Sequence, residues 1–306
     1  MKKHFITNFL LIGFLLINTS CAKAQKSFSS DNPAYVIYNS SGRKVSYDAM
    51  LKSLAKADVS LFGELHNDPI SHWLELSIFQ DLHKIKGDKL LAGAEMWERD
   101  NQIVLDEFLN DENMDMGTYM QNSVLWKNFD TDYRPILQYA KDNNIKFVAT
   151  NIPRRYARMV SQSGERVLDS LSDAAKAFIA PLPIHLDLKN DFYEFIADVF
   201  KESRRTPMKG SSLANLVKAQ AVKDATMAWF ILQDLNDNEH FFHFHGELHS
   251  AFNSAIAYYL KHYRPNVKCK TISIVKKGDV MDFSSKDSRA DFNIVVPSNM
   301  TMTYVD

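Results

Sequence analysis

Short apolar runs alternate with longer stretches in which apolar residues recur at helical spacing, and this pattern continues over most of the chain. The short runs predict buried strands, and the longer stretches predict amphipathic helices. Strict alternation of the two predicts an α/β fold, a mostly parallel sheet with helices on both faces. The predicted strands cover 34–39, 59–62, 89–97, 145–151, 240–245, 267–277 and 291–297, and the helices between them cover 46–57, 69–86, 100–110, 133–144 and 250–262.

The segment 154–236 breaks this alternation because it contains no strand pattern. Proline and glycine residues divide it into four helical stretches. These predict helices at 154–163, 172–180, 190–203 and 213–236. The strand patterns resume after this segment. The sequence therefore predicts a small four-helix domain at 154–236, inserted into an α/β core formed by 34–153 and 237–306.

The N-terminal 21 residues have the pattern of a secretory signal rather than of a folded element. Lys2 and Lys3 precede an apolar stretch, Phe9–Ile17, that is too short to span a bilayer. Cleavage after Ala24 gives a signal peptide at 1–24 and a polar tether at 25–33. The lipobox-like ending Thr19–Cys21 gives instead a lipid anchor on Cys21. Both alternatives predict export to the cell envelope, as an outer-membrane-attached lipoprotein or a periplasmic protein.

Composition narrows the class of protein further. Aromatic residues make up 12% of the chain and charged residues 24%, which is typical of a globular protein. Removal of the signal deletes Lys2, Lys3 and, in one alternative, Lys23, which lowers the net charge from −1 to −3 or −4. This charge argues against a nucleic-acid partner, which requires a basic face. Cys269 is the one cysteine besides Cys21, so no internal disulfide is expected and stability must come from core burial.

The tetrapeptide Gly-Glu-Leu-His occurs twice, at Gly63–His66 and at Gly246–His249. Each copy follows a predicted strand directly. Ligands bind at the carboxyl edge of parallel strands, where loops and helix N-termini converge. The alternative is that each copy is ordinary turn chemistry, a turn glycine followed by a carboxylate in the first helical turn. The duplication favours one shared site, built from strand-end residues Glu64, His66, Glu95, Asn151, Glu247 and His249.

Four stretches, "LFGELHNDPISHW", "GAEMW", "YRPILQYAK…FVATNIPR" and "FHGELH", carry a resemblance to a known family. They resemble the ChaN family of haem-binding, iron-regulated lipoproteins, within the Tiki, TraB and erythromycin-esterase superfamily. The resemblance covers roughly 34–296. The family's paired G-x-x-H elements match the two tetrapeptides, its acidic strand end matches Glu95, and its N-x-P-R corner matches Asn151–Arg154. It implies an α/β core with a small helical domain, and haem bound through a tyrosinate, with a homodimer as one arrangement.

The resemblance does not place the tyrosinate, and the residues leave three candidates: Tyr156, Tyr133 and Tyr193. Tyr156 lies among Arg154, Arg155 and Arg158. Guanidinium charges favour a phenolate, the form that binds ferric iron, and they also pair with haem propionates. The predicted haem contacts are therefore Tyr156 or Tyr133 with Asn151, Arg154 and Arg155. The alternative is that Tyr156 packs on the sheet and the arginines are solvated.

A second function uses the same strand ends differently. Glu64, His66, Glu95 and His249 would activate water, as in an esterase or a metal-dependent peptidase. His66, His245 and His249 are the candidate ligands for a divalent metal in that case. Haem acquisition and hydrolysis therefore both stand as hypotheses from the sequence.

Overall fold

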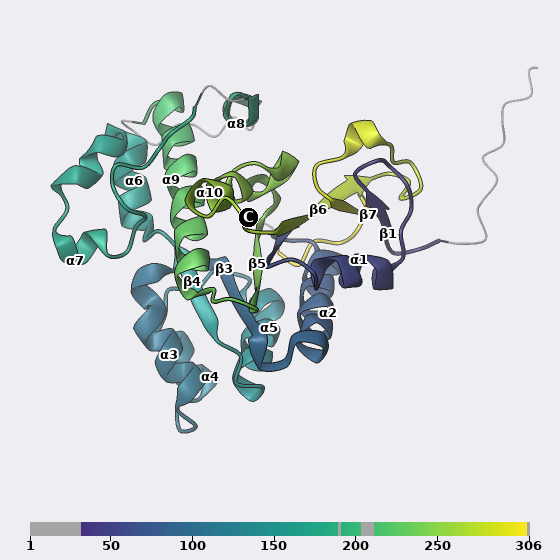
Figure 1. Ribbon diagram of the computed structural model, residues 1–306, viewed down its shortest axis with the longest axis horizontal. Coiled ribbons are helices and arrows are strands. Elements are labelled where there is room, and N and C mark those ends of the chain that lie inside the picture. Colours follow the sequence, from purple (N-terminus) through teal and green to yellow (C-terminus); the bar gives the residue numbers. More distant parts are fainter. Residues whose placement is uncertain (1–31, 189–190, 203–210, 305–306) are drawn as a thin grey trace, which may run out of the picture. The chain divides into compact units, whose positions relative to one another are not determined.

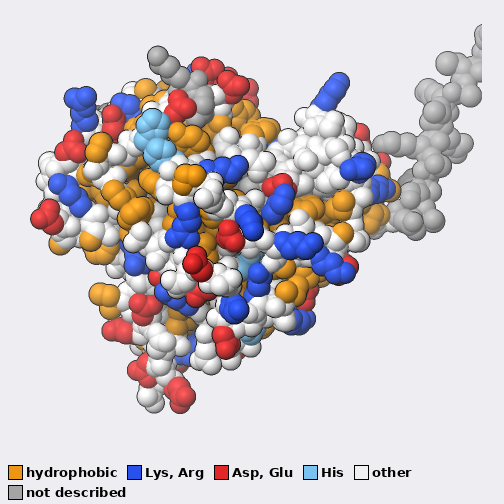
Figure 2. All heavy atoms as spheres, viewed as in Figure 1, with side chains coloured by type: hydrophobic (Ala, Val, Ile, Leu, Met, Phe, Trp, Pro, Cys, Tyr) orange, Lys and Arg blue, Asp and Glu red, His pale blue; other side chains and the backbone are white. Residues whose placement is uncertain are grey.

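The computed structural model describes residues 32–188, 191–202 and 211–304. The predicted signal peptide, Cys21 and residues 25–31 of the predicted tether lie outside the described residues. Within the described part, no helix is both long enough and apolar enough to cross a membrane. On the face shown in Figure 2, basic and acidic side chains are interspersed.

A seven-stranded sheet forms the centre of the fold, in the order β1-β7-β6-β2-β5-β3-β4 (Figure 1). Every pairing is parallel except that of β1 with β7 at one edge. This confirms the predicted mostly parallel sheet. The strands are β1 Val36–Asn39, β2 Val59–Glu64, β3 Leu90–Glu98, β4 Phe147–Asn151, β5 His240–Gly246, β6 Cys269–Lys277 and β7 Phe292–Pro297.

Helices cover both faces of the sheet because successive strand side chains point to opposite sides. In β5, Phe242 and Phe244 pack in one core, while Phe241 packs in the other. The first core is covered by α1 Tyr47–Leu54, α2 Pro69–Lys86, α3 Gln102–Asn110, α4 Met116–Asn122 and α5 Arg134–Asp142. The second core is covered by α6 Arg154–Ser163, α9 Leu213–Asp234 and α10 Ile256–Tyr263.

The predicted ends of α2 are confirmed by their chemistry. Asp68 caps the helix by accepting a hydrogen bond from the Ser71 N–H at 3.0 Å, and Pro69 occupies the first turn. Gly87 follows the last turn at a φ of 54°, a left-handed value that glycine adopts without strain. These two signals fix where α2 begins and where it ends.

Two predicted segments are wrong in detail. The stretch after α3, where no helix was predicted, contains α4, which Asp115 caps by accepting from the Thr118 N–H. The helix expected at 250–262 begins only at Ile256. Phe252, Asn253 and Ala255 adopt φ values of 59°, 56° and 52°, which interrupt a right-handed helix. No proline or glycine in 250–256 indicates this interruption in the sequence.

The described residues of segment 154–236 form helices and connecting loops and contain no strand, as expected. It contains α6, the single turn α7 Asp173–Lys176, α8 Asp191–Glu202 and α9. Residues of α6 and α9 share a core with the sheet, and residues from Pro33 onward group as one compact unit. The boundaries of an inserted domain at 154 and 236 stay a prediction.

Gly93 in β3 lies at a position where the packing of the sheet leaves no space for a side chain. A Cβ added there would lie 2.6 Å from the Val148 carbonyl oxygen and 2.9 Å from Cζ of Phe241. Because that oxygen belongs to the paired strand, it cannot move away cheaply. We expect Gly93→Ala to lower the free energy of unfolding by about 1–3 kcal/mol in urea denaturation.

Gly278→Ala is the matched control, since an added Cβ there meets no atom within 4 Å. It should change the free energy of unfolding by less than about 0.5 kcal/mol. Equal effects of the two substitutions would contradict this description of the packing.

Candidate functional site

The two tetrapeptides end at the same edge of the sheet because β2 and β5 are neighbouring parallel strands. Their register pairs Gly63 with His245 and Glu64 with Gly246. The other neighbour of β5 is β3, which carries Glu95 just beyond its paired residue Ala94. Three adjacent strand ends therefore deliver Glu64, Glu95 and the second tetrapeptide to one place.

Glu95 lies at the centre of this group. Its Oε2 accepts a hydrogen bond from the Gly246 N–H at 2.9 Å, and its Oε1 lies 3.0 Å from Nε2 of His249. His66 packs against the same glycine, since a Cβ on Gly246 would lie 2.7 Å from its Nε2. Burial opposes the ionisation of Glu95, but the charges of His249 and His66 outweigh it and hold the pKa of Glu95 well below its usual range. Both imidazoles thus flank one carboxylate.

His249 is held between two buried carboxylates. Its Nδ1 lies 2.5 Å from Oδ1 of Asp224 on α9, and its Nε2 faces Glu95. The second oxygen of Asp224 accepts from the Tyr193 hydroxyl at 3.2 Å. Burial would lower the pKa of His249, but Glu95 and Asp224 together raise the pKa to about 9. His249 is therefore an imidazolium at neutral pH.

Glu64 and His66 form a second acid–imidazole pair. Oε1 of Glu64 lies 2.6 Å from Nδ1 of His66 and accepts from the Tyr133 hydroxyl at 2.6 Å. Burial opposes protonation of His66, but the hydrogen bond to Glu64 outweighs it and raises the pKa of His66. Unlike Glu64, the His66 side chain is 36% exposed, so an incoming molecule can reach it.

Beneath this pair lies a buried group that the sequence did not single out. Nδ1 of His72 lies 3.0 Å from Oε2 of Glu75 and 3.6 Å from Oε2 of Glu64. Both residues come from α2, one turn apart. The signal in the sequence was the pair His72-x-x-Glu75, which places an imidazole and a carboxylate on one helical face directly after the first tetrapeptide.

The structure does not bring His66, His245 and His249 into one set of ligand atoms. Among the described residues, the one group of three metal-binding side chains whose ligand atoms lie within 4.8 Å of one another is Glu64, His72 and Glu75. Nδ1 of His245 lies 2.9 Å from Nδ1 of His243. Burial lowers the pKa of His243 to about 3 and that of His245 well below its usual range, so both are neutral.

The two tetrapeptides are not equivalent, because their glutamates face different partners. Glu247 forms an ion pair with Arg289 and lies 3.5 Å from Ser273 Oγ on β6. It therefore does not join the group around Glu95. Asn151 does join it, since its Nδ2 donates to the Glu95 carbonyl at 2.8 Å.

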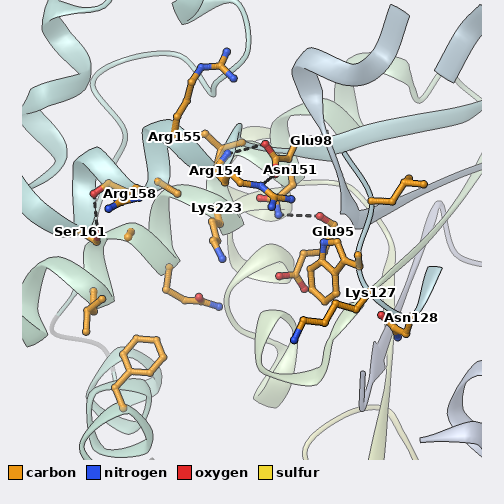
Figure 3. A pocket seen from close by; sticks show the side chains of 18 of the residues that line it. Glu95, Glu98, Lys127, Asn128, Asn151, Arg154, Arg155, Arg158, Ser161 and Lys223 are labelled. Carbon is orange, nitrogen blue, oxygen red and sulfur yellow. Dashed lines mark hydrogen bonds and ion pairs between the residues drawn. The ribbon is translucent and has the colours of Figure 1, made fainter. Parts of the chain in front are cut away.

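A cavity of about 920 Å³ opens beside Glu95, between β3, α6 and α9 (Figure 3). In Figure 3, Arg154 is turned toward Glu98 and Lys223 extends into the open space. The walls combine two kinds of side chain. The basic residues are Lys127, Arg154, Arg155, Arg158 and Lys223, and the apolar ones include Leu125, Trp126, Ile152, Phe200 and Leu216.

The tyrosines predicted as iron ligands do not line this cavity. Tyr156 is buried in the core, with the Arg155 guanidinium 4.4 Å above its ring. Tyr133 is fully buried, and burial together with Glu64 raises its pKa far above the usual value, so it stays a phenol. Tyr193 donates to Asp224. Among the described residues, the tyrosine that lines the cavity is Tyr304.

The raised pKa of His249 predicts how stability depends on pH. The folded pKa is about 9 against 6.5 for a free imidazole, so the stabilisation is complete below pH 6.5 and is lost as the pH rises through 9. The free energy of unfolding should fall by at most about 1.4 kcal/mol per pH unit across this range from this group. Urea denaturation at several pH values measures the slope.

His66 also has a raised pKa, so the contribution of His249 is read as a difference. In His249→Gln the slope between pH 6.5 and 9 should be shallower than in the wild type. Identical slopes would show that Glu95 and Asp224 do not hold a proton on His249.

Comparison with known proteins agrees with this architecture. A family model described as haem-binding uptake, Tiki superfamily, ChaN matches residues 50–260. A solved structure of cofacial haem binding to ChaN of Campylobacter jejuni has a TM-score of 0.68 and 18% identity, over 87% of this chain and 98% of that one. At that identity the likeness shows the fold.

Two further likenesses are weaker. An open form of the erythromycin esterase EreC has a TM-score of 0.45 and 11% identity, over 80% of this chain and 77% of that one. Protein RETICULATA-RELATED 5, chloroplastic, of Arabidopsis thaliana is 27% identical over 206 residues, which cover 61% of this chain but 26% of that protein. The chain thus spans about a quarter of the length of that curated relative. The family match covers more than half of the chain, and the chain belongs to the ChaN haem-binding uptake family of the Tiki superfamily.

Proposed function

We propose that this chain is an exported protein of haem and iron acquisition, which binds haem in the cavity beside Glu95. The observation that carries the proposal is the composition of the cavity walls, in which basic side chains face an apolar surface. Family membership supports haem as the ligand. The signal pattern before Cys21 supports export, and the family resemblance supports a lipid anchor on Cys21 and a homodimer.

The cavity meets the chemical demands of a porphyrin. Haem requires an apolar slot, an axial ligand and cations for its two propionates. Trp126, Phe200 and Leu216 supply apolar surface. Two of the arginines are already engaged, since Arg154 pairs with Glu98 and Arg155 pairs with Asp100. Arg158 and Lys223 are the cations that we assign to the propionates, because they line the cavity and form no ion pair within the described residues.

We assign the axial ligand to Tyr304. It is the tyrosine that lines the cavity among the residues that the structure describes. Tyr133 is held as a hydrogen-bond donor to Glu64, and Tyr156 packs in the core below Arg155. When bound, haem supplies a ferric iron that a phenolate can ligate.

Haemin titration of the full-length chain tests this assignment. The wild type should give a saturable Soret shift with the charge-transfer band of a phenolate on ferric iron. Tyr304→Phe should abolish that band, whereas Tyr156→Phe should retain it. Arg158→Gln and Lys223→Gln should keep the band but weaken haemin affinity by roughly two- to fivefold, as expected for one exposed ion pair each.

Arg134→Gln is the matched control for Arg158→Gln, because Arg134 is an exposed arginine that pairs with Asp130 and does not line the cavity. It should leave haemin affinity unchanged. The absence of any Soret shift at micromolar wild-type chain would overturn the haem proposal. Loss of the band in Tyr156→Phe but not in Tyr304→Phe would overturn only the ligand assignment.

The second candidate function is hydrolysis of an ester or a peptide. Its specific support is that Glu95 lines the cavity while the imidazoles of His66 and His249 flank it. His66, oriented by Glu64 and partly exposed, is suited to act as a general base. His249, held as an imidazolium, is suited to stabilise negative charge that develops on a substrate oxygen. These roles require no metal at His66 or His249.

Hydrolysis of p-nitrophenyl acetate provides a direct assay. If the site is catalytic, Glu95→Gln and His66→Asn should each lower kcat/KM by about 100-fold or more. Glu165→Gln serves as the control, since Glu165 pairs with Lys218 and does not line the cavity. A wild-type rate no greater than that of Glu95→Gln would remove this candidate and leave the haem proposal untouched.

A further inference from the structure

We propose that Glu64, His72 and Glu75 bind a divalent cation beneath the end of β2, in a site separate from the cavity. None of the three residues lines the cavity, and each is 6% exposed or less. Their ligand atoms lie within 4.8 Å of one another. The haem proposal plays no part in this inference, which stands on the contacts of these three side chains.

Glu64 presents one oxygen to this site while the other is fully occupied. Its Oε1 accepts from the Tyr133 hydroxyl and contacts Nδ1 of His66, both at 2.6 Å. Its Oε2 is buried and has no hydrogen-bond partner within the described residues. That oxygen is the one that faces His72, at 3.6 Å from Nδ1. The carboxylate is therefore oriented, with a lone pair directed at the proposed cation.

His72 is oriented in the same manner. Its Nε2 lies 3.1 Å from the His66 carbonyl oxygen and 3.3 Å from Oδ2 of Asp132, and both of these atoms accept hydrogen bonds. A proton on Nε2 leaves the lone pair on Nδ1, which points toward the two glutamates. Asp132 is itself fixed by Asn128 at 2.6 Å and Thr303 at 2.8 Å. A carboxylate or carbonyl behind the imidazole is the usual support of a metal-binding histidine.

Glu75 completes the set with a second unpartnered oxygen. Its Oε2 contacts Nδ1 of His72 at 3.0 Å, and its Oε1 is buried with no hydrogen-bond partner in the described part of the chain. Two carboxyl groups and an imidazole nitrogen thus meet inside the protein. Such an arrangement is costly unless a cation or a shared proton lies between them.

The ligand types indicate which cation. One imidazole and two carboxylates suit a first-row divalent ion such as Zn²⁺ or Mn²⁺. The ion would join the first turns of α2 to the end of β2, because Glu64 ends the strand and His72 and Glu75 lie on the helix. It would therefore hold Glu64, and through it His66, in place.

Metal content of the full-length chain, prepared without haem, tests the site. The protein is stripped with a chelator, loaded with Zn²⁺ or Mn²⁺, desalted and analysed by mass spectrometry for metal per chain. The wild type should retain close to one equivalent of one of these ions, and its melting temperature should rise on loading. Glu75→Gln should weaken binding at least about tenfold and show no rise.

Glu247→Gln is the control, since Glu247 is the corresponding buried glutamate of the second tetrapeptide and pairs with Arg289. It should retain the ion. If Glu75→Gln fails to fold, Co²⁺ loading of the wild type provides the answer through its visible d–d absorption. Absence of retained Zn²⁺ and Mn²⁺, with no Co²⁺ spectrum, overturns the site. A carboxylic acid band in the infrared spectrum would then identify a shared proton in its place.

Discussion

The parallel pairing of β2 with β5 is the constraint on which the rest of the site depends. Their register sets Glu64 beside Gly246, so both tetrapeptides end at one edge of the sheet. Gly246 then provides space for the His66 ring, because any Cβ at that position would collide with it. Its N–H also anchors Glu95 from the neighbouring strand β3. A slip in this register would separate the two imidazoles from the carboxylate they share.

Compensation of buried charge explains the chemistry at this edge. Glu64, Glu95 and Asp224 are carboxylates with 5% exposure or less, and each requires a proton, a donor or a cation nearby. His249 lies between Glu95 and Asp224 and offsets the charge of both carboxylates. The Glu64 carboxylate is instead stabilised by His66 and by the Tyr133 hydroxyl. The same logic separates the two proposed binding sites in space. The basic and apolar cavity wall suits haem, while the acidic group below β2 suits a small cation.

Local signals in the sequence were sufficient to predict most of the helices and strands. Asp68 and Gly87 marked the ends of α2, and apolar runs located the strands. Partners distant in sequence could not be read in this way. No residue near Glu247 in the sequence indicates its ion pair with Arg289. Asp224 is one polar residue of a long helix in the sequence, and only the packing of α9 places it against His249. The arginines around Tyr156 suggested an iron ligand, but sequence neighbours cannot show that the ring lies in the core rather than in the cavity.

The central claim is that haem occupies the cavity between β3, α6 and α9. Crystals of the full-length chain grown with haemin test it most directly, through an anomalous difference map measured at the iron absorption edge. The account predicts one strong iron peak inside the cavity, within ligating distance of the Tyr304 hydroxyl and on the side of Glu95 that faces Lys223. An iron peak elsewhere on the chain, or no peak with haemin in excess, would contradict it.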